Sequence, residues 1–273
     1  MSLFLSSVGG KLYKKKTLKI IILGKTDTGK TFLSFRLVKE FLKLKRKVGI
    51  LCSDLGQSCI GPPGCVSFKL FSSLKKTPSS YVPADFMEFV GTLSPSANLA
   101  NHLLATKMVL DKALAKAEVI IINTTGYIKG EEARFLKFSK IRIIKPDVIV
   151  ALQEKDELEK ILKFFEGTIY IVRLKKSERV KKRTAGERAS FRERLFHAYF
   201  KRAKIVIFFA KSCFKENMVV GLLDERLTTL GLGRIEKVEK HKVKVLLPYS
   251  VEAKRVRYLL PSLIFRERPI NCC

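Results

Sequence analysis

A glycine-rich loop between an apolar run and a helical pattern constrains this chain more than any other feature. The apolar run at residues 18–23 is followed directly by the sequence Gly-Lys-Thr-Asp-Thr-Gly-Lys-Thr. Leu33, Leu37 and Phe41 then recur every four residues, which is typical of one face of a helix. A strand, a loop of this pattern and a helix, in that order, predict a P-loop that binds a nucleoside triphosphate.

The residues of this loop have complementary roles in phosphate binding. Its glycines let backbone N–H groups turn onto phosphate oxygens, and the start of the helix adds positive potential. The lysine can reach the β- and γ-phosphates, and the last threonine hydroxyl can ligate Mg²⁺. The expected nucleotide-binding residues are Gly24, Lys25, Thr26, Asp27, Thr28, Gly29, Lys30 and Thr31, with Thr31 as a metal ligand.

Charge is the second constraint on function. The chain has 273 residues, and 54 Lys and Arg against 25 Asp and Glu give a net charge of +29. Such an excess suggests a polyanionic partner, most simply a nucleic acid, although an anionic membrane surface would also satisfy it. No apolar run approaches the ~20 residues that span a bilayer, and the N-terminus has no signal-peptide pattern. We therefore expect a nucleic-acid partner, no membrane partner and a cytoplasmic location.

The order of elements predicts the fold class. Strands are expected at residues 18–23, 48–52, 119–122, 148–152 and 169–172, with helices at 31–45, 100–115 and 157–165 between them. This alternation predicts an α/β fold of the P-loop NTPase type: a doubly wound, mostly parallel sheet with helices on both faces. Ligands of such sheets bind at the carboxyl ends of the strands.

The pattern changes near residue 205. Residues 175–204 are strongly basic and are expected to be helical, and short strands are expected at 219–223, 231–235, 243–247 and 256–260. We therefore predict a P-loop domain over residues 1–204, which includes the basic helix, and a small β-rich domain over residues 205–273.

Polar residues follow two of the predicted strands. Asp54 comes after the second strand, where it could hold Mg²⁺ through water or accept a proton from an attacking hydroxyl. An aspartate that merely caps a turn is the alternative. The third strand ends at Asn123, where P-loop ATPases often have an acidic residue, so the acidic role is assigned to Asp54. Thr124 and the Gly126 backbone could contact a substrate phosphate or sugar, and Tyr127 could stack on a base or pack in the core.

The basic segment contains two stripes at helical spacing. Phe191, Leu195 and Tyr199 form an apolar stripe that can pack on the body of the protein. Arg188 and Arg192 form a second stripe, and two like charges four residues apart are unfavourable until an anion binds between them. They could close over a triphosphate as an arginine finger does, and a solvated basic face is the alternative.

Taken together, these motifs resemble those of the polynucleotide 5′-hydroxyl kinase family, whose eukaryotic members act in RNA processing. The P-loop includes Asp27, like the acidic residue in the family's loop, and Asp54-Leu55-Gly56-Gln57 resembles its Asp-x-Gly-Gln segment. Thr124-Thr125-Gly126-Tyr127 resembles its Thr-x-Gly-Trp clasp, and Arg188-x-x-x-Arg192 its lid. The resemblance covers residues 18 to about 250. Tyr127 departs from it by replacing the clasp tryptophan, and the family's N-terminal β-domain is not expected here.

The resemblance implies transfer of the γ-phosphate of ATP, with Mg²⁺, to the 5′-hydroxyl end of RNA or DNA. It implies catalytic roles for Asp54, Lys30, Arg188 and Arg192, and metal binding by Thr31 and Asp54. The implied substrate-binding residues are Asp27, Gln57, Thr124, Gly126 and Tyr127. It leaves open the preference between RNA and DNA and between single and double strands, as well as GTP as donor.

Three other functions fit parts of the sequence. Lys25 occupies the place of the signature lysine in partitioning-type or chaperone-type ATPase switches, which hydrolyse ATP without phosphorylating a polymer. The loop is also similar to that of dethiobiotin-synthetase-type ligases. An RNA-binding protein with a vestigial site is the non-enzymatic alternative.

Overall fold

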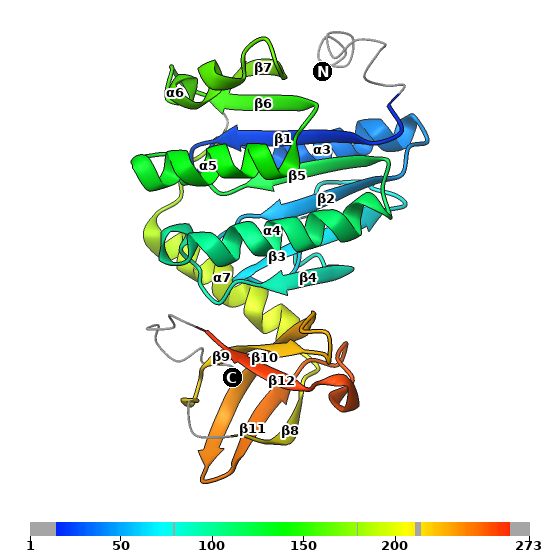
Figure 1. Ribbon diagram of the computed structural model, residues 1–273, viewed down its shortest axis with the longest axis vertical. Helices are drawn as coiled ribbons and strands as arrows, with labels where there is room; N and C mark the ends of the chain where they lie inside the picture. Colours follow the sequence, from blue (N-terminus) through cyan, green and yellow to red (C-terminus); the bar gives the residue numbers. More distant parts are fainter. Residues whose placement is uncertain (1–14, 79, 179, 211–213, 263–273) are drawn as a thin grey trace.

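Two β-sheets, one above the other along the long axis, organise the chain in the computed structural model (Figure 1). The structure describes residues 15–78, 80–178, 180–210 and 214–262. The seven strands of the first sheet are β1 (Leu18–Gly24), β2 (Val48–Ser53), β3 (Cys65–Phe71), β4 (Phe86–Phe89), β5 (Val119–Thr124), β6 (Val148–Gln153) and β7 (Tyr170–Lys175). The helices are α3 (Lys30–Lys43), α4 (Leu99–Leu114), α5 (Glu131–Ile144), α6 (Glu159–Leu162) and α7 (Ala185–Phe200).

The first sheet has the order β4-β3-β2-β5-β1-β6-β7. Strands β2, β5, β1, β6 and β7 run parallel to one another. Strands β3 and β4 extend the sheet beyond β2 through antiparallel pairs. The central strand β1 pairs Ile22 with Asn123 of β5 and Gly24 with Leu152 of β6. The P-loop therefore lies beside the carboxyl ends of β5 and β6, and the predicted α/β P-loop fold is confirmed.

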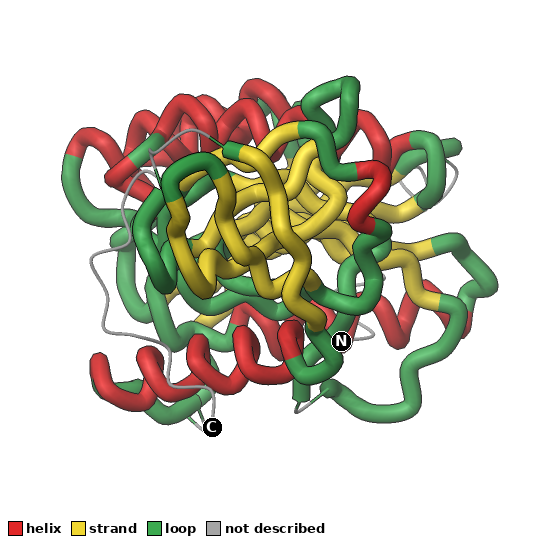
Figure 2. The backbone as a smooth tube through the Cα atoms, turned by 90° about the horizontal axis from the view of Figure 1, so that it is seen from below, coloured by secondary structure: helices red, strands yellow, loops and turns green. Residues whose placement is uncertain are grey.

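Alternate residues of the parallel strands face opposite layers, which is why these strands read as continuous apolar runs. On β1, Ile20 and Ile22 pack with α3, whereas Ile21 and Leu23 pack with α4 and α5. Figure 2 shows helices on both sides of the strands. The two buried layers hold the strand ends, and hence the loops that follow them, in fixed positions.

Three parts of the sheet and its cover were not expected from sequence. No element was expected at β3, β4 or α5: Ser67 and Lys69 interrupt β3, β4 has only four residues, and lysines and a serine interrupt the apolar residues of α5. Residues 176–178 and 180–184, which were expected to be helical with the rest of 175–204, are not. α7 begins at Ala185 because Thr184 and Glu187 form a capping box, in which each side chain bonds to the other's backbone.

The second sheet is antiparallel with the order β12-β9-β10-β11-β8. Its strands are β8 (Lys204–Phe209), β9 (Val219–Leu223), β10 (Thr229–Glu239), β11 (Lys242–Leu247) and β12 (Tyr258–Pro261). The β-rich C-terminal part expected from sequence is thus present, with β8 as an additional strand. The division at residue 204 stays a prediction, and residues 211–213 and 263–273 lie outside the described residues.

The C-terminal half of α7 joins the two sheets. Phe196 and Phe200 are buried with Met87 and Phe89 of β4 and with Leu232 of β10. Leu195 is also buried, whereas Phe191 and Tyr199 are only half-buried, so the packed face is offset from the expected stripe. Within the described part of the chain, no helix is both long and apolar enough to cross a membrane.

Replacing Phe196 tests this junction. Phe196 is 3% exposed, and Phe196→Ala would leave a cavity between the sheets, so we expect the free energy of unfolding to fall by about 3–5 kcal/mol. Phe135→Ala is the matched control, because Phe135 is 57% exposed on α5 and its truncation should change stability by less than about 1 kcal/mol. Chemical denaturation of both variants checks this, and equal losses would contradict the role of Phe196.

Candidate nucleotide-binding and catalytic site

A cavity of about 810 Å³ lies at the carboxyl ends of the strands, between the P-loop, the loop after β2 and the start of α7. A volume of this size is in the range of ligand-binding pockets. Of the residues predicted from sequence, it is lined by Thr26, Asp27, Thr28, Gly29, Lys30, Thr31, Asp54 and Gln57. Gly24 and Lys25 are not among the described residues that line the cavity, but the Lys25 carbonyl oxygen accepts hydrogen bonds from Thr28 and Lys30 within the loop.

Lys30 is held inward within the P-loop. Its Nζ donates to the carbonyl oxygen of Lys25 at 2.6 Å, and Thr28 Oγ1 donates to the same oxygen at 2.9 Å. Lys30 is 6% exposed, and burial lowers the pKa of its ammonium group to about 8, against the opposing charges of Asp54 and Asp27. At pH 7 a lysine with this pKa is still mostly charged, and a triphosphate bound here would favour the charged form further.

Asn123 occupies the position beside the predicted metal ligand. Its Nδ2 donates to Thr31 Oγ1 at 3.3 Å and to the Cys59 sulfur at 3.3 Å. Its Oδ1 is buried and has no hydrogen-bond partner among the described residues. Asn123 itself is fully buried, but it contacts Thr31, which lines the cavity together with Asp54. A buried acceptor without a partner at this point fits a hydrated Mg²⁺ ion bound to a triphosphate.

The loop after β2 places Asp54 and Gln57 in the same wall. Asp54 Oδ1 accepts from the backbone N–H of Gln57 at 3.1 Å, so the carboxylate also organises its own turn. Gln57 Nε2 donates to the carbonyl oxygen of Arg188 at 3.3 Å, and its Oε1 accepts from Arg183 at 3.2 Å. Gln57 thereby connects the β2 loop to the start of α7.

The start of α7 also contacts the P-loop. Asp27 Oδ2 accepts from the backbone N–H of Arg183 at 3.0 Å and lies 3.6 Å from Arg188 Nη1. Arg192 lies one turn further along α7 and is half-buried. Neither Arg188 nor Arg192 is among the described residues that line the cavity, so both would have to turn inward to reach a phosphate.

The loop after β5 supports the P-loop from behind. A Cβ atom on Gly126 would lie 2.3 Å from Thr26 Oγ1 and 2.4 Å from its backbone nitrogen, so only glycine fits. Thr124 is completely buried, and its hydroxyl donates to the Ile22 carbonyl at 2.8 Å. Tyr127 donates to Glu132 at 3.0 Å. Neither Thr124 nor Tyr127 is among the described residues that line the cavity, so the structure does not bring them to the predicted substrate position.

Two buried lysines on α5 lie beneath these loops. Lys137 donates to Thr124 Oγ1 at 3.1 Å and to the carbonyl oxygen of Thr125. Lys140 donates to Ser53 Oγ and lies 2.8 Å from His102 Nε2. Both lysines are completely buried, one turn apart, below the ends of β5 and β2.

Burial dominates the charge state of this cluster. It lowers the pKa of Lys140 to about 7, which the charges of Asp54 and Cys52 oppose, and lowers that of Lys137 well below its usual range. Burial and Lys140 hold the pKa of His102 well below 6.5, so the imidazole is neutral at pH 7. Sequence analysis missed this cluster because α5 was not recognised as a helix. Its signal was the apolar set Ala133, Leu136, Ile141 and Ile144, which shares a helical face with both lysines.

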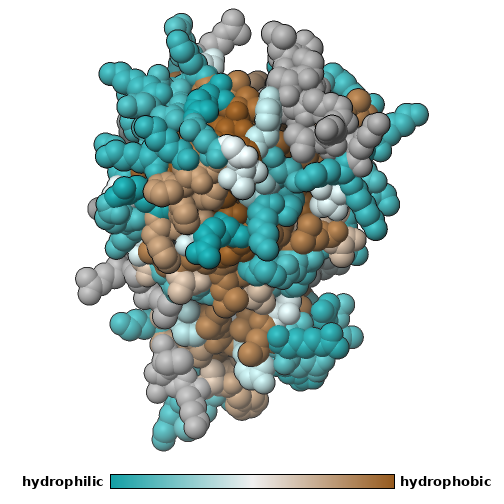
Figure 3. All heavy atoms as spheres, turned by 45° about the horizontal axis from the view of Figure 1, so that its top comes forward, coloured by the Kyte–Doolittle hydropathy of each residue, from teal (hydrophilic) through white to brown (hydrophobic). Residues whose placement is uncertain are grey.

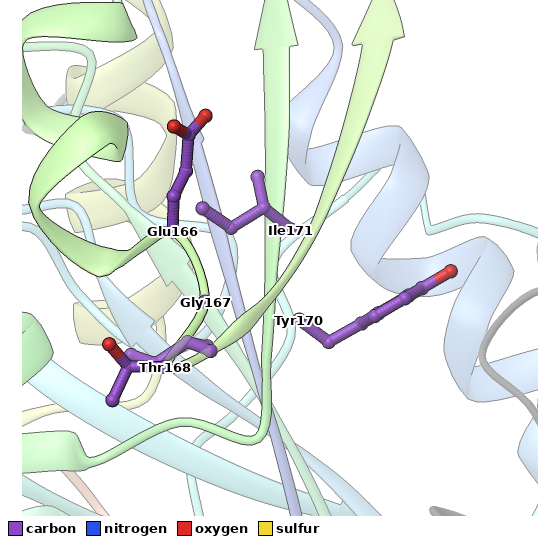
Figure 4. Close-up of a pocket in the computed structure, with 6 residues that line it drawn as sticks. Glu166, Gly167, Thr168, Tyr170 and Ile171 are labelled. Atoms are coloured by element: carbon purple, nitrogen blue, oxygen red, sulfur yellow. The ribbon is translucent and has the colours of Figure 1, made fainter.

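A second, shallower cavity of about 360 Å³ lies at the edge of the first sheet. It is lined by residues 166–171 at the start of β7, and its side chains point to different sides of the strand (Figure 4). It contains no P-loop residue, so it is separate from the nucleotide site.

The fold and the loop geometry define a protein of the P-loop NTPase class. Residues 24–202 match the model of the family described as mRNA cleavage and polyadenylation factor CLP1 P-loop, and the chain belongs to this family. This finding confirms the kinship that the four motifs indicated.

Curated relatives carry kinase names. A polyribonucleotide 5′-hydroxyl-kinase of Methanocaldococcus jannaschii is 41% identical over 197 residues, covering 70% of this chain and 52% of the relative. One of Pyrococcus horikoshii is 36% identical, covering 71% of this chain and 53% of the relative. A CLP1 homologue of Anopheles gambiae is 25% identical, covering 69% and 47%. The chain thus spans about half the length of the curated relatives it matches.

A solved structure supports the fold over nearly the whole chain. Clp1p in a complex with Pcf11p superposes with a TM-score of 0.74 at 15% identity, covering 97% of this chain and 79% of that one. At this identity the likeness concerns the fold alone, and it includes the second sheet as well as the P-loop domain.

Gly126→Ala tests the contact behind the P-loop. The added methyl group would collide with the Thr26 backbone and displace the loop, so we expect ATP affinity to fall about tenfold or more. Gly186→Ala is the control, because the nearest atom to its Cβ is 3.9 Å away. Calorimetric titration with ATP measures both, and unchanged affinity in Gly126→Ala would refute the requirement for glycine.

The buried lysines predict how stability depends on pH. A lysine titrates near pH 10.4 in the unfolded chain, whereas Lys140 titrates near pH 7 in the fold. Between these values the unfolded chain binds more protons, so the contribution of Lys140 to stability rises with pH, by up to about 1.4 kcal/mol per pH unit, and is lost as the pH falls through 7.

Urea unfolding at pH 7.0 and 8.5 measures this slope. Lys140→Met should flatten it, whereas Lys107→Met, which alters a lysine on the exposed side of α4, should leave it unchanged. An identical slope in wild type and Lys140→Met would show that Lys140 keeps an ordinary pKa.

Proposed function

We propose that this protein is an ATP-dependent polynucleotide 5′-hydroxyl kinase that acts on RNA. The observation that carries the proposal is a single cavity lined by Thr26–Thr31 of the P-loop, Asp54 and Gln57, with Arg183 in its wall and Arg188 beside Asp27. The kinase names of archaeal relatives at 36–41% identity support the same reaction and favour RNA over DNA. The overall reaction converts ATP and a 5′-hydroxyl end into ADP, a 5′-phosphate end and a proton.

Each residue of the site has a separate role in the proposed reaction. The P-loop backbone and Lys30 hold the β- and γ-phosphates, and Asp27 lines the loop where donor and acceptor meet. Asp54 accepts the proton of the 5′-hydroxyl as its oxygen attacks the γ-phosphorus, and Gln57 contacts the acceptor. Arg188 and Arg192 turn inward when the triphosphate binds and offset its negative charge. Thr124 and Gly126 act indirectly, because they fix the loop after β5 behind the P-loop.

Thr31, Asp54 and the free Oδ1 of Asn123 would hold Mg²⁺ or its water ligands. A magnesium ion bound there supplies positive charge to the transferring phosphate. The net charge of +29 supports a polyanionic acceptor. In the view of Figure 3, hydrophilic side chains gather in the upper part of the molecule, and hydrophobic ones extend through its centre. A cytoplasmic location belongs to the proposal, because ATP and RNA are both available there.

Two substitutions test the reaction. Lys30→Ala should abolish phosphate transfer and weaken ATP binding, whereas Asp54→Ala should lower the transfer rate at least about 100-fold while ATP still binds, because it removes only the general base. Asp111→Ala is the control, since Asp111 is half-exposed on α4 and pairs with Lys107. The measurement is transfer of label from γ-labelled ATP to short 5′-hydroxyl RNA and DNA, with 5′-phosphorylated strands for comparison.

The outcome also separates the proposal from its main rival. ATP hydrolysis without label transfer, especially with ATP-dependent dimerisation, would identify a switch ATPase. A wild-type rate in Asp54→Ala would refute the assignment of the base.

A further inference from the structure

Two cysteines meet where the cavity reaches the end of β2. Cys52 is the penultimate residue of β2, and its side chain is completely buried. Cys59 follows seven residues later, is half-buried and lines the cavity. We call these two residues the thiol pair. The proposed phosphate transfer uses neither of them, so their contact calls for a separate explanation.

The contact between the two side chains is direct. The backbone N–H of Cys59 donates to Cys52 Sγ at 3.2 Å, and the two thiols are hydrogen-bonded to each other. Disulfide geometry excludes cysteines whose Cα atoms are more than about 7 Å apart or whose side chains point apart. Side chains that are hydrogen-bonded to each other do not point apart, so this pair can be bridged with little movement of the backbone.

The strand on one side of the pair is held more firmly than the loop on the other. Within β2, Cys52 is paired with Ser67 of β3 and with Asn123 of β5. Cys59 lies in the loop that follows β2. A disulfide has an S–S length of about 2.05 Å, which is shorter than any hydrogen-bonded contact. Closing that gap should therefore displace Cys59 and its loop rather than β2.

A displacement of Cys59 would reach the nucleotide site in two ways. Cys59 Sγ accepts from Asn123 Nδ2 at 3.3 Å, and the same nitrogen donates to Thr31 Oγ1 at 3.3 Å. A sulfur drawn onto Cys52 would leave this buried amide with a weaker partner. The segment between the two cysteines also carries Asp54 and Gln57, which line the cavity. A bridge would therefore change both the proposed metal site and the wall beside it.

We propose that the thiol pair is a modification site that reacts with small disulfides, and that the resulting Cys52–Cys59 bond lowers the affinity of the cavity for Mg²⁺ and a nucleoside triphosphate. The inference rests on the nucleotide-binding cavity and does not require phosphate transfer. It explains why a half-buried thiol lines this cavity in contact with a second, buried thiol.

The exchange consists of two balanced steps. Cys59 reacts first because it lines the cavity: its thiol loses a proton, its sulfur attacks a small disulfide RSSR, and the departing RS⁻ takes up that proton as RSH. Cys52 then loses its proton, and its sulfur attacks Cys59 Sγ and displaces the second RS⁻, which leaves as RSH. The two cysteines lose two electrons in total, and RSSR gains them.

Disulfide mapping tests the bond itself. The reduced full chain is treated with hydroxyethyl disulfide at pH 8.5, because the contact with Cys52 raises the pKa of the Cys59 thiol and exchange requires the thiolate. Peptide mass spectrometry should find a bond between Cys52 and Cys59. Cys65→Ser is the matched control, since it alters a buried cysteine of β3, and it should form the same bond. A hydroxyethyl adduct that stays on Cys59, or no reaction at Cys59, would overturn the proposal.

Calorimetric titration tests the effect on the cavity. Mg²⁺ with a non-hydrolysable ATP analogue should bind the bridged protein about tenfold or more weakly than the reduced protein, and dithiothreitol should restore the affinity. Cys59→Ser should bind like reduced wild type, because a serine hydroxyl can also accept from Asn123, and hydroxyethyl disulfide should leave its affinity unchanged. Equal affinities of bridged and reduced wild type would overturn the link between the thiol pair and the nucleotide site.

Protection by the nucleotide tests the position of Cys59. With Mg²⁺ and the ATP analogue at ten times its Kd, about one molecule in eleven has an empty cavity, so the bond should form about tenfold more slowly. An unchanged rate would show that the small disulfide does not enter through the nucleotide site, and would overturn the proposed order of steps.

These measurements need no acceptor RNA, which separates this proposal from the kinase proposal. A protein that forms the bond and binds the analogue, but transfers no phosphate, would refute the kinase function alone. A protein that transfers phosphate but forms no Cys52–Cys59 bond would refute the modification site alone.

Discussion

The hydrogen bonds of three buried lysines beneath the strand ends are the interactions on which the site depends. Lys30, Lys137 and Lys140 are all withdrawn from water, yet each donates to a carbonyl or hydroxyl oxygen of the P-loop, β5 or β2. Removing an ammonium group from water is costly unless such partners and an opposite charge compensate. Asp54 supplies that charge to all three lysines. The same carboxylate is the proposed base, so electrostatic compensation and catalysis meet in one residue.

The sequence predicted the parts of this arrangement that are governed by local pattern. The strand–loop–helix of the P-loop, the strand before Asp54 and the parallel core follow from apolar runs and turn residues. β3 and β4 did not, because Ser67 and Lys69 interrupt the apolar residues of β3 and the edge strand β4 has only four residues. α5 was hidden for a different reason: Lys137 and Lys140 stand at core positions, and their burial is stabilised only by partners from β2 and β5, distant in sequence. No local pattern reveals such a contact.

Some residues of the candidate site were predicted correctly to lie together, and others were not. Asp27, Lys30, Asp54 and Gln57 were predicted to act together, and the structure brings them to one cavity. Thr124 and Tyr127 were predicted as substrate contacts, but the β5 register turns Thr124 into the core and the bond to Glu132 directs Tyr127 elsewhere. Phe32 and Arg36, which line the same cavity, were not predicted, because no local pattern distinguishes them from other exposed residues of a helix.

The two ends of α7 are attached to the rest of the protein in different ways. Its C-terminal half is wedged between the two sheets, through Phe196 and Phe200, while its first turns reach Asp27 and Gln57 only through polar contacts. Apolar packing thus holds the C-terminal half of α7, whereas polar contacts hold its first turns. The C-terminal half of α7 is therefore held more firmly than its first turns, and the second sheet helps to position residues that contact the nucleotide site in the first sheet.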